Sequence, residues 1–337
     1  MTHTERLDAL AKLGTTLAKL DSEERNAVFE KATLRNPWFT HENLERALAG
    51  VCRYLERDAL NQWAAQYPLD KTPQKKVGVV MAGNIPMVGF HDMLCVLVAG
   101  HILHGKLSQK DEVLLPFVAE KLSEIEPRFA ERIHWTERLK EVDAYIATGS
   151  NNSARYFEHY FADYPHLIRK NRTAWAVLSG EETDEELLRL GEDVFTYFGL
   201  GCRNVSRLWL PEGYDMKHLL DVWQAFEHLC NHNKYLNNYE YQRGIRLMNQ
   251  RPIYDSGFLV LEESEGVTAP TGMLFYGYYK QPDEIHQAIE AADEDIQCVV
   301  SKTGDFRRGV RFGEAQKPKL SDYADGVDTM DFLTRKL

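Results

Sequence analysis

The run VGVVM (Val77–Met81), followed by AGNIP (Ala82–Pro86), decides which fold the rest of this sequence has to fit. A short, mostly apolar run that ends in a glycine and a proline is typical of a buried strand that leads into a tight turn. The next stretch, from about Val88 to His101, is apolar and long enough to form a helix. The sequence therefore predicts a strand, a turn and a helix in succession.

The same alternation continues along the chain. Up to Leu178 the predicted elements are a strand near Lys106, a helix from Glu112 to Ile125, a strand around Val142 to Ala147, a helix from Ser153 to Phe161 and a strand from Thr173 to Leu178. After Glu182 they are a helix from Glu185 to Phe198, a strand from Val205 to Leu210, a helical stretch from Asp215 to Met248, strands near Phe258 and Leu274, a helix from Asp283 to Ala292 and a strand from Gln297 to Ser301. Alternating strands and helices imply an α/β fold with mostly parallel, doubly wound sheets.

Length and composition limit what the chain does. Its 337 residues exceed what one core usually organises, so two domains are expected, and residues 4 to 66 carry a helical leucine spacing. The net charge of -11 argues against general binding to nucleic acid or anionic membrane. The longest apolar run, Met93 to Ala99, is too short to span a bilayer. Five scattered cysteines without a CxxC pair fit a reducing compartment, and we expect a cytoplasmic protein.

Cys202 lies in the run GLGCRNVSRLWL (Gly199–Leu210), where glycines precede it and a strand-like segment follows. This pattern predicts a tight turn that enters a strand. Because the thiolate is a strong nucleophile, a cysteine on an open polar turn is a candidate for covalent catalysis. The alternative is that Cys202 fills the core, since unpaired cysteines are among the most buried residues.

Four stretches in a fixed order resemble the aldehyde dehydrogenase superfamily, and within it the LuxC-type acyl-CoA reductases. They are GNIP (Gly83–Pro86), KLSQK (Lys106–Lys110), TGSNNSAR (Thr148–Arg155) and CRNVSR (Cys202–Arg207). The resemblance runs from about Lys76 to the C-terminus. It implies an aldehyde-dehydrogenase-like fold of two Rossmann-like domains, with an N-terminal helical region and a C-terminal bridging tail.

The resemblance also implies a division of the chain. Residues 1–67 would form the helical part of the cofactor domain, 68–178 the NAD(P)-binding domain and 179–305 the catalytic domain with Cys202. Residues 306–337 would form a tail that takes part in oligomerisation, so a homo-oligomer is expected.

In the superfamily, residues that match Cys202 and Asn84 carry the chemistry. Cys202 would be the nucleophile that attacks a carbonyl, and the Asn84 side-chain amide would donate to the resulting oxyanion. An asparagine beside a proline turn can also simply satisfy local backbone groups.

Cofactor contacts are implied for two loops. Lys106 would meet the adenosine ribose, and relatives that prefer NAD commonly carry an acidic residue where this chain has Gln109, next to Lys110. The absence of that acid removes repulsion against a 2′-phosphate, so NADPH is favoured, with NADH as the alternative. Gly149, Ser150 and Asn151 would meet the pyrophosphate at the start of a helix. Ala154 departs from the glycine usual in this loop.

Val177 stands where hydrolytic aldehyde dehydrogenases carry a glutamate that activates water. An apolar side chain cannot accept that proton, whereas a coenzyme A thiol, with a pKa of about 8.5, needs no such base. The resemblance therefore implies reduction of an acyl-CoA thioester, with a fatty acyl group, to the aldehyde. An acyl-donating enzyme is an expected partner.

Several alternatives stay open. The protein could act on short acyl-CoA or on acyl phosphate, or it could bind acyl groups or nucleotides without catalysis. His228 and His232 stand at i and i+4 of a predicted helix, with Cys230 between them, but no second cluster completes a metal site, and no metal is expected. The tyrosines at 235, 239 and 241 could line a pocket or fill the core. The basic residues between Lys302 and Lys319 could meet coenzyme A phosphates or form a solvated face.

Overall fold

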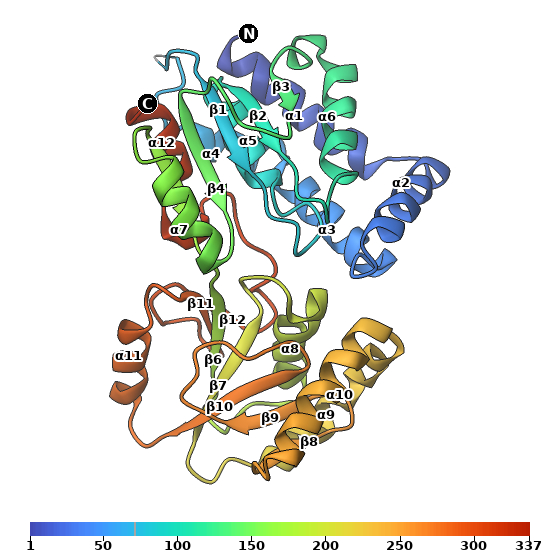
Figure 1. Ribbon diagram of the computed structural model, residues 1–337, viewed down its shortest axis with the longest axis vertical. Coiled ribbons are helices and arrows are strands. Elements are labelled where there is room, and N and C mark those ends of the chain that lie inside the picture. The colour runs from blue at the N-terminus through green and yellow to red at the C-terminus, as the bar shows by residue number, and fades with distance from the viewer. Residues whose placement is uncertain (71) are drawn as a thin grey trace. The chain divides into compact units, whose positions relative to one another are not determined.

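The computed structural model describes residues 1–70 and 72–337, which form two compact units (Figure 1). The first unit consists of Met1–Asn171 and Lys319–Leu337, and the second unit consists of Arg172–Pro318. The chain therefore crosses into the second unit after Asn171 and returns to the first after Pro318.

Helices open the first unit: α1 (His3–Ala18), α2 (Ser22–Arg35), α3 (His41–Tyr54) and α4 (Arg57–Ala64). Each of the first three begins at a residue whose side chain satisfies an otherwise unpaired helix N–H group. Thr2 and Thr40 do so for α1 and α3, and Asp21 accepts from the first turn of α2. The leucines of α1 point inward and are almost completely buried.

The described residues of the first unit form a parallel five-stranded sheet in the order β3-β2-β1-β4-β5 (Figure 1). Its strands are β1 (Lys76–Val80), β2 (Ile102–Lys106), β3 (Ile133–Trp135), β4 (Ala144–Thr148) and β5 (His166–Arg169), and its helices are α5 (Phe90–Ala99), α6 (Leu114–Ile125) and α7 (Asn151–Tyr160). The strand order reverses between β1 and β4, which both pair with their neighbours in parallel. Ligands of doubly wound sheets bind beside such a reversal, at the carboxyl ends of the strands.

The end of the chain is part of the first unit. Helix α12 (Thr329–Arg335) packs on α5, and Met330 and Leu333 are completely buried. Arg169 forms a buried ion pair with Asp92 at 2.6 Å and donates to the hydroxyl of Thr329 at 2.7 Å. These contacts fix the returning segment to the sheet.

The second unit contains a seven-stranded sheet, counted over its described residues, in the order β12-β11-β6-β7-β10-β9-β8. Its strands are β6 (Thr173–Val177), β7 (Val205–Pro211), β8 (Ile253–Asp255), β9 (Val260–Glu263), β10 (Met273–Tyr279), β11 (Ile296–Ser301) and β12 (Gly309–Arg311). Its helices are α8 (Asp184–Phe195), α9 (Met216–Trp223), α10 (Asn233–Met248) and α11 (Pro282–Ala291). The edge strand β8 pairs antiparallel with β9, and the other pairs are parallel.

The α/β fold class predicted from the sequence is confirmed, with differences in detail. The boundary between the units lies after Asn171 rather than after Leu178, because β6 pairs with β7 and β11 of the second unit. The expected tail 306–337 is split: its first part stays in the second unit and Lys319–Leu337 joins the first. The helical stretch expected from Asp215 to Met248 is broken between α9 and α10, where the His232 side chain caps α10. The short strands β3, β5, β8 and β12 were not expected.

Within the described residues, none of the helices combines the length and the apolar character that crossing a membrane requires.

Candidate active site

Asn84 lies in the loop that connects β1 to α5, at the carboxyl edge of the first unit's sheet, and is half-buried. Close packing against the next loop fixes this segment. A Cβ atom on Gly83 would lie 2.6 Å from both side-chain atoms of Ser108, so only glycine allows the two loops to meet here. The Met81 N–H also donates to the Lys106 carbonyl at 3.0 Å.

Asp111 is a buried residue that is hydrogen-bonded to the end of the Asn84 loop. Its side chain is 3% exposed and its carboxylate accepts the Met87 N–H at 2.8 Å. Met87 has a left-handed φ of 56°, a conformation that bulky residues keep only where their surroundings hold them. Burial raises the pKa of Asp111 to about 7, although backbone N–H groups lower it in part. Sequence reasoning missed this residue, because it lies among charged neighbours in a predicted loop.

We expect Asp111→Asn to change how stability depends on pH. The folded-state pKa of about 7 lies above the ordinary 3.8, so the stabilising contribution of Asp111 is complete below about pH 4 and is lost as pH rises through 7. The amide does not titrate but can still accept from Met87. Between pH 4 and 7 the free energy of unfolding should therefore fall less steeply in the variant, by up to roughly 1.4 kcal/mol per pH unit.

Urea unfolding at a series of pH values measures this difference. Asp21→Asn, which makes the same substitution at an exposed helix cap in the same unit, is the control for exchanging aspartate for asparagine. If wild type and Asp111→Asn differ by the same amount at every pH, the pKa of Asp111 is not raised.

The predicted ribose contacts lie at the carboxyl end of β2. Lys106 ends the strand, and Gln109 and Lys110 follow on a turn; all three side chains are exposed. Ser108 shapes the turn, since its hydroxyl accepts the Lys110 N–H at 3.3 Å. The side chain of the buried Asn36 adds a bond to the Lys110 carbonyl.

The predicted pyrophosphate contacts lie at the carboxyl end of β4. Gly149 closes the strand, and the Ser150 hydroxyl caps α7 by accepting the Ser153 N–H at 3.2 Å. A Cβ on Gly149 would lie 2.8 Å from that of Ser153, so this glycine serves the packing of its own helix. The side chain of Asn151 lies outside the described part of the structure. Ala154, at the position of the usual glycine, is completely buried.

These groups suit a dinucleotide. The structure brings Asn84, the β2 turn and the Gly149–Ser150 loop to one edge of one sheet, on both sides of the point where the strand order reverses. Two exposed ammonium groups, an exposed amide and a helix N-terminus form a donor set that fits phosphate and ribose oxygens. Lys106, Gln109 and Lys110 would hold the adenosine end, and the start of α7 would hold the pyrophosphate.

Cys202 belongs to the second unit, on the turn between α8 and β7. The chain leaves α8 through a left-handed run, with φ values of 55° at Tyr197, 57° at Phe198 and 74° at Gly199. Cys202 follows three residues after this run and is half-buried, so the predicted tight turn into a strand is present. None of the five cysteines forms a disulfide in the described part of the chain.

The Ser-Arg pair that follows Cys202 is structural. Ser206 shares a hydrogen bond of 2.7 Å with the Thr173 hydroxyl. The Arg207 guanidinium is buried over the ring of Trp209, at 4.4 Å, and donates to the carbonyls of Ser264 and Gly266. These contacts join β7 to β6 and to the segment that follows β9.

Val177 is the last residue of β6 and is 8% exposed. It packs in an apolar cluster with Ile285 and Ile289 of α11 and with Val299 of β11. An apolar residue in such a cluster cannot take a proton from water.

The other candidate residues have local structural partners. His232 caps α10, and the tyrosines 235 and 239 are buried whereas Tyr241 is exposed. No group of three or more potential metal ligands converges in the part of the chain that the structure describes. Of the basic residues near the end of the second unit, Lys302 pairs with Glu186 and Arg308 with Asp293.

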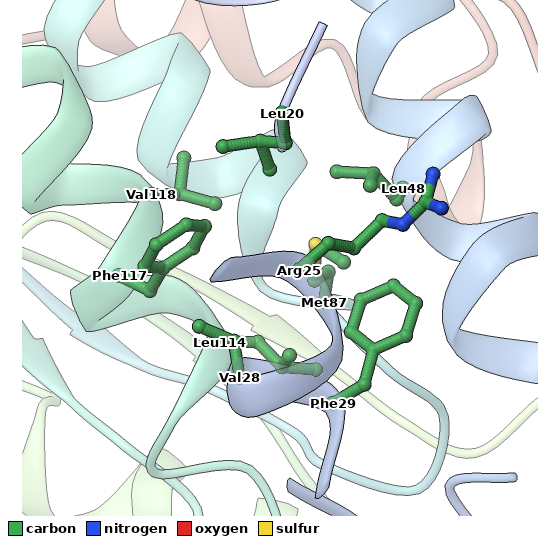
Figure 2. Close-up of a pocket in the computed structure, with 9 residues that line it drawn as sticks. All are labelled: Leu20, Arg25, Val28, Phe29, Leu48, Met87, Leu114, Phe117 and Val118. Atoms are coloured by element: carbon green, nitrogen blue, oxygen red, sulfur yellow. The ribbon is translucent and has the colours of Figure 1, made fainter. Parts of the chain in front are cut away.

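A small cavity lies behind the Asn84 loop in the first unit (Figure 2). Met87 faces it together with Leu20, which lies between α1 and α2, and with side chains of α2, α3 and α6: Arg25, Val28, Phe29, Leu48, Leu114, Phe117 and Val118. Its volume of about 10 Å³ corresponds to roughly one water molecule. This cavity is therefore too small to hold an acyl chain.

Comparison with solved structures finds the same fold in aldehyde dehydrogenases. An aldehyde dehydrogenase of Bacillus cereus in complex with NAD+ aligns at a TM-score of 0.63 and 13% identity, over 90% of this chain and 73% of that chain. An NADP-dependent enzyme of E. coli aligns at a TM-score of 0.64 and 12% identity, over 89% and 73% of the two chains. The indole-3-acetaldehyde dehydrogenase AldA of P. syringae aligns at 0.66 and 12%, over 89% and 72%.

No protein-family model and no curated protein matches the chain. At these identities the likeness establishes the fold, and the aldehyde-dehydrogenase-like architecture predicted from the four motifs is confirmed.

Proposed function

We propose that this protein reduces an acyl-CoA thioester to the aldehyde with a nicotinamide cofactor, through an acyl-enzyme on Cys202. The observation that carries the proposal is the Cys202 turn: a half-buried thiol behind a left-handed backbone run. Such strained turns cluster at functional sites. By the motif resemblance, Val177 of the same unit would stand at the position of the hydrolytic base, and its side chain lies in an apolar cluster. The fold shared with aldehyde dehydrogenases supports this choice.

In the first step the Cys202 thiolate attacks the thioester carbonyl. A bond forms between Sγ and the carbonyl carbon, and the electron pair of the carbonyl π bond moves to oxygen. By the motif resemblance, the Asn84 side-chain amide and the Cys202 N–H would donate to that oxyanion and stabilise it. When the carbonyl re-forms, the bond to the coenzyme A sulfur breaks, and the leaving thiolate takes a proton from solvent.

A nicotinamide cofactor, held by Lys106, Gln109, Lys110 and the start of α7, would supply the hydride that reduces the acyl-enzyme. The same two donors then hold the oxygen of the thiohemiacetal on Cys202. Its collapse releases the aldehyde and restores the Cys202 thiolate. Because Val177 cannot activate water, the acyl group persists on Cys202 until it is reduced.

We further propose that the substrate carries a fatty acyl chain, and that the protein is a cytoplasmic homo-oligomer. Its partner would be an enzyme that donates the acyl group. These proposals rest on the resemblance of the four sequence motifs to LuxC-type reductases.

First-turnover release of coenzyme A tests the proposal. Purified protein is mixed with a panel of acyl-CoA substrates of increasing chain length, without nicotinamide, and the protein is then removed by ultrafiltration so that free coenzyme A can be measured in the filtrate. The separation is needed because acyl transfer to Cys202 consumes one thiol for each thiol that it releases. We expect one free coenzyme A per active chain, followed by loss of reduced-nicotinamide absorbance when NADPH is added. Release that continues for many turnovers without nicotinamide would indicate a hydrolase and contradict the proposal, as would the absence of release from every substrate.

Gln109→Glu tests the proposed preference for NADPH. The new carboxylate would repel a 2′-phosphate and accept from the ribose hydroxyls, so we expect the ratio of NADPH to NADH affinity to fall about tenfold. Gln109 is exposed, so the substitution leaves the core intact. Fluorescence titration with both cofactors gives the ratio.

The matched control is Gln62→Glu, which makes the same charge change on the exposed face of α4. It should leave the ratio unchanged. An unchanged ratio in Gln109→Glu as well would mean that the ribose binds elsewhere.

A further inference from the structure

Asn204 lies two residues after Cys202 and is 2% exposed. Its side-chain oxygen accepts the Gly201 N–H at 2.8 Å. Its side-chain nitrogen lies within hydrogen-bond distance of three carbonyl oxygens at the end of α8, those of Asp193 (3.0 Å), Val194 (3.2 Å) and Thr196 (2.8 Å). One buried carboxamide thus connects the Cys202 turn to the helix before it.

The backbone of Asn204 is fixed as well. Its N–H donates to the Gly201 carbonyl at 3.1 Å, which closes the turn around Cys202. Its carbonyl accepts from the Ala174 N–H at 3.0 Å and from the Thr173 hydroxyl at 3.1 Å, both on β6. Asn204 is therefore tied to the sheet through its backbone and to α8 through its side chain.

The side-chain bonds of Asn204 enclose the strained part of the turn. Thr196 precedes the left-handed run and Gly201 follows it, and Asn204 bonds to both. A left-handed backbone is unfavourable for residues other than glycine, because Cβ comes too close to the following carbonyl oxygen, and Tyr197 and Phe198 both adopt it. Such a conformation persists only where its surroundings hold it.

The end of α8, whose carbonyls bond to the Asn204 side chain, is held in place by hydrogen bonds of its own. The Asp193 side chain is completely buried, and its carboxylate accepts the N–H groups of Gly313 at 2.6 Å and Ala315 at 3.0 Å. The last turn of α8 is therefore a fixed point from which Asn204 sets the position of the Cys202 turn.

We propose that Asn204 is a positioning residue that fixes the Cys202 backbone, and with it the thiol and the Cys202 N–H, in the geometry needed for attack on the carbonyl. This inference rests on the proposed function. It goes beyond it because the motif resemblance assigns a role to Cys202 but none to Asn204. Asparagine suits the position because one short side chain both accepts from Gly201 and donates to the helix carbonyls.

Asn204→Ala and Asn204→Asp test the inference in the full-length protein. Alanine removes every side-chain bond, whereas aspartate keeps the acceptor for Gly201 but loses the donors. The first readout is amide hydrogen exchange at Gly201 and Cys202, which does not depend on any substrate. The second is the rate of first-turnover thiol release from an acyl-CoA of the panel.

The matched control is Asp255→Ala on the edge strand β8, three strands from β7. It also removes several bonds at once, among them those to the Tyr239 hydroxyl at 2.6 Å and the Gly257 N–H at 3.0 Å. It therefore reports the effect of a general loss of stability in the same unit.

We expect Asn204→Ala to speed exchange at the turn about tenfold and to slow acylation about 100-fold, the loss typical of a reacting group displaced by about 1 Å. Asp255→Ala should change neither. The inference is overturned if exchange at the turn is unchanged, if acylation survives a loosened turn, or if Asp255→Ala slows acylation equally. A wild-type chain that releases no thiol would contradict the proposed function instead, while exchange still decides whether Asn204 holds the turn.

Discussion

Cys202→Ala should abolish acyl-enzyme formation, lowering first-turnover thiol release and reductase activity by at least about 10⁴-fold. The nucleophile carries the covalent bond through both steps, so no other group can substitute for it. Cys202 is half-buried, and the hydrogen bonds between Gly201 and Asn204 that close the turn do not involve its sulfur. The amount of coenzyme A released measures acyl-enzyme formation, and the loss of reduced-nicotinamide absorbance measures reductase activity.

Cys202→Ser separates chemistry from packing, because the hydroxyl keeps the shape of the side chain but is a far weaker nucleophile. It should be nearly as inactive as the alanine variant. Cys52→Ala is the matched control: Cys52 is also half-buried, on α3 of the first unit, and burial raises the pKa of its thiol. Full activity in Cys202→Ala, or equal loss in Cys52→Ala, would remove Cys202 from the mechanism.

Much of the fold could be predicted because its central elements are continuously apolar. β1 and α5 lie in the core of the first unit, where Val77, Val79 and nearly all of α5 are buried, and buried elements leave unbroken apolar runs. β3 and β8 could not be predicted. They are edge strands of three residues with partly exposed side chains, so they carry no alternating pattern.

The return of the chain end to the first unit also could not be predicted from the sequence. It depends on pairs far apart in sequence, such as the Trp63 indole that donates to the Tyr323 hydroxyl at 2.7 Å and the ring of His101 bonded to the Leu333 carbonyl at 2.9 Å. The pattern of apolar residues in a segment indicates which of its faces is buried, but it does not indicate which other segment packs against that face.

The residues of the candidate site also fall into two groups, those that the sequence indicated and those that it did not. Asn84 and Cys202 could be singled out because glycine and proline mark their turns within a few residues. Asp111 and Asn204 could not, because what marks them is burial by other elements. Asp111 stands beside charged residues as a solvated loop residue would, and the side-chain partners of Asn204 include carbonyls 8 to 11 residues back along the chain.

Asn84→Ala should lower the rate of acylation by about 10²–10³-fold and leave the KM for acyl-CoA nearly unchanged. An oxyanion donor acts on charge that develops only in the transition state, so its loss appears in kcat rather than in substrate binding. The loop that carries Asn84 is also held by the packing of Gly83 against Ser108 and by the hydrogen bond from the Met87 N–H to Asp111, and both remain in the variant. Rapid-mixing measurement of released coenzyme A at a series of acyl-CoA concentrations gives both the rate of acylation and the KM.

A second reagent distinguishes this role from a general disturbance. Iodoacetamide alkylates a thiolate by displacement at a saturated carbon, and no oxyanion forms in that reaction. Alkylation of Cys202 should therefore proceed at the wild-type rate in Asn84→Ala, whereas acylation falls. Asn61→Ala, an exposed asparagine on α4, should leave both rates unchanged. If alkylation and acylation fall together in Asn84→Ala, the asparagine affects the reactivity of the thiol itself and is not the donor to the oxyanion.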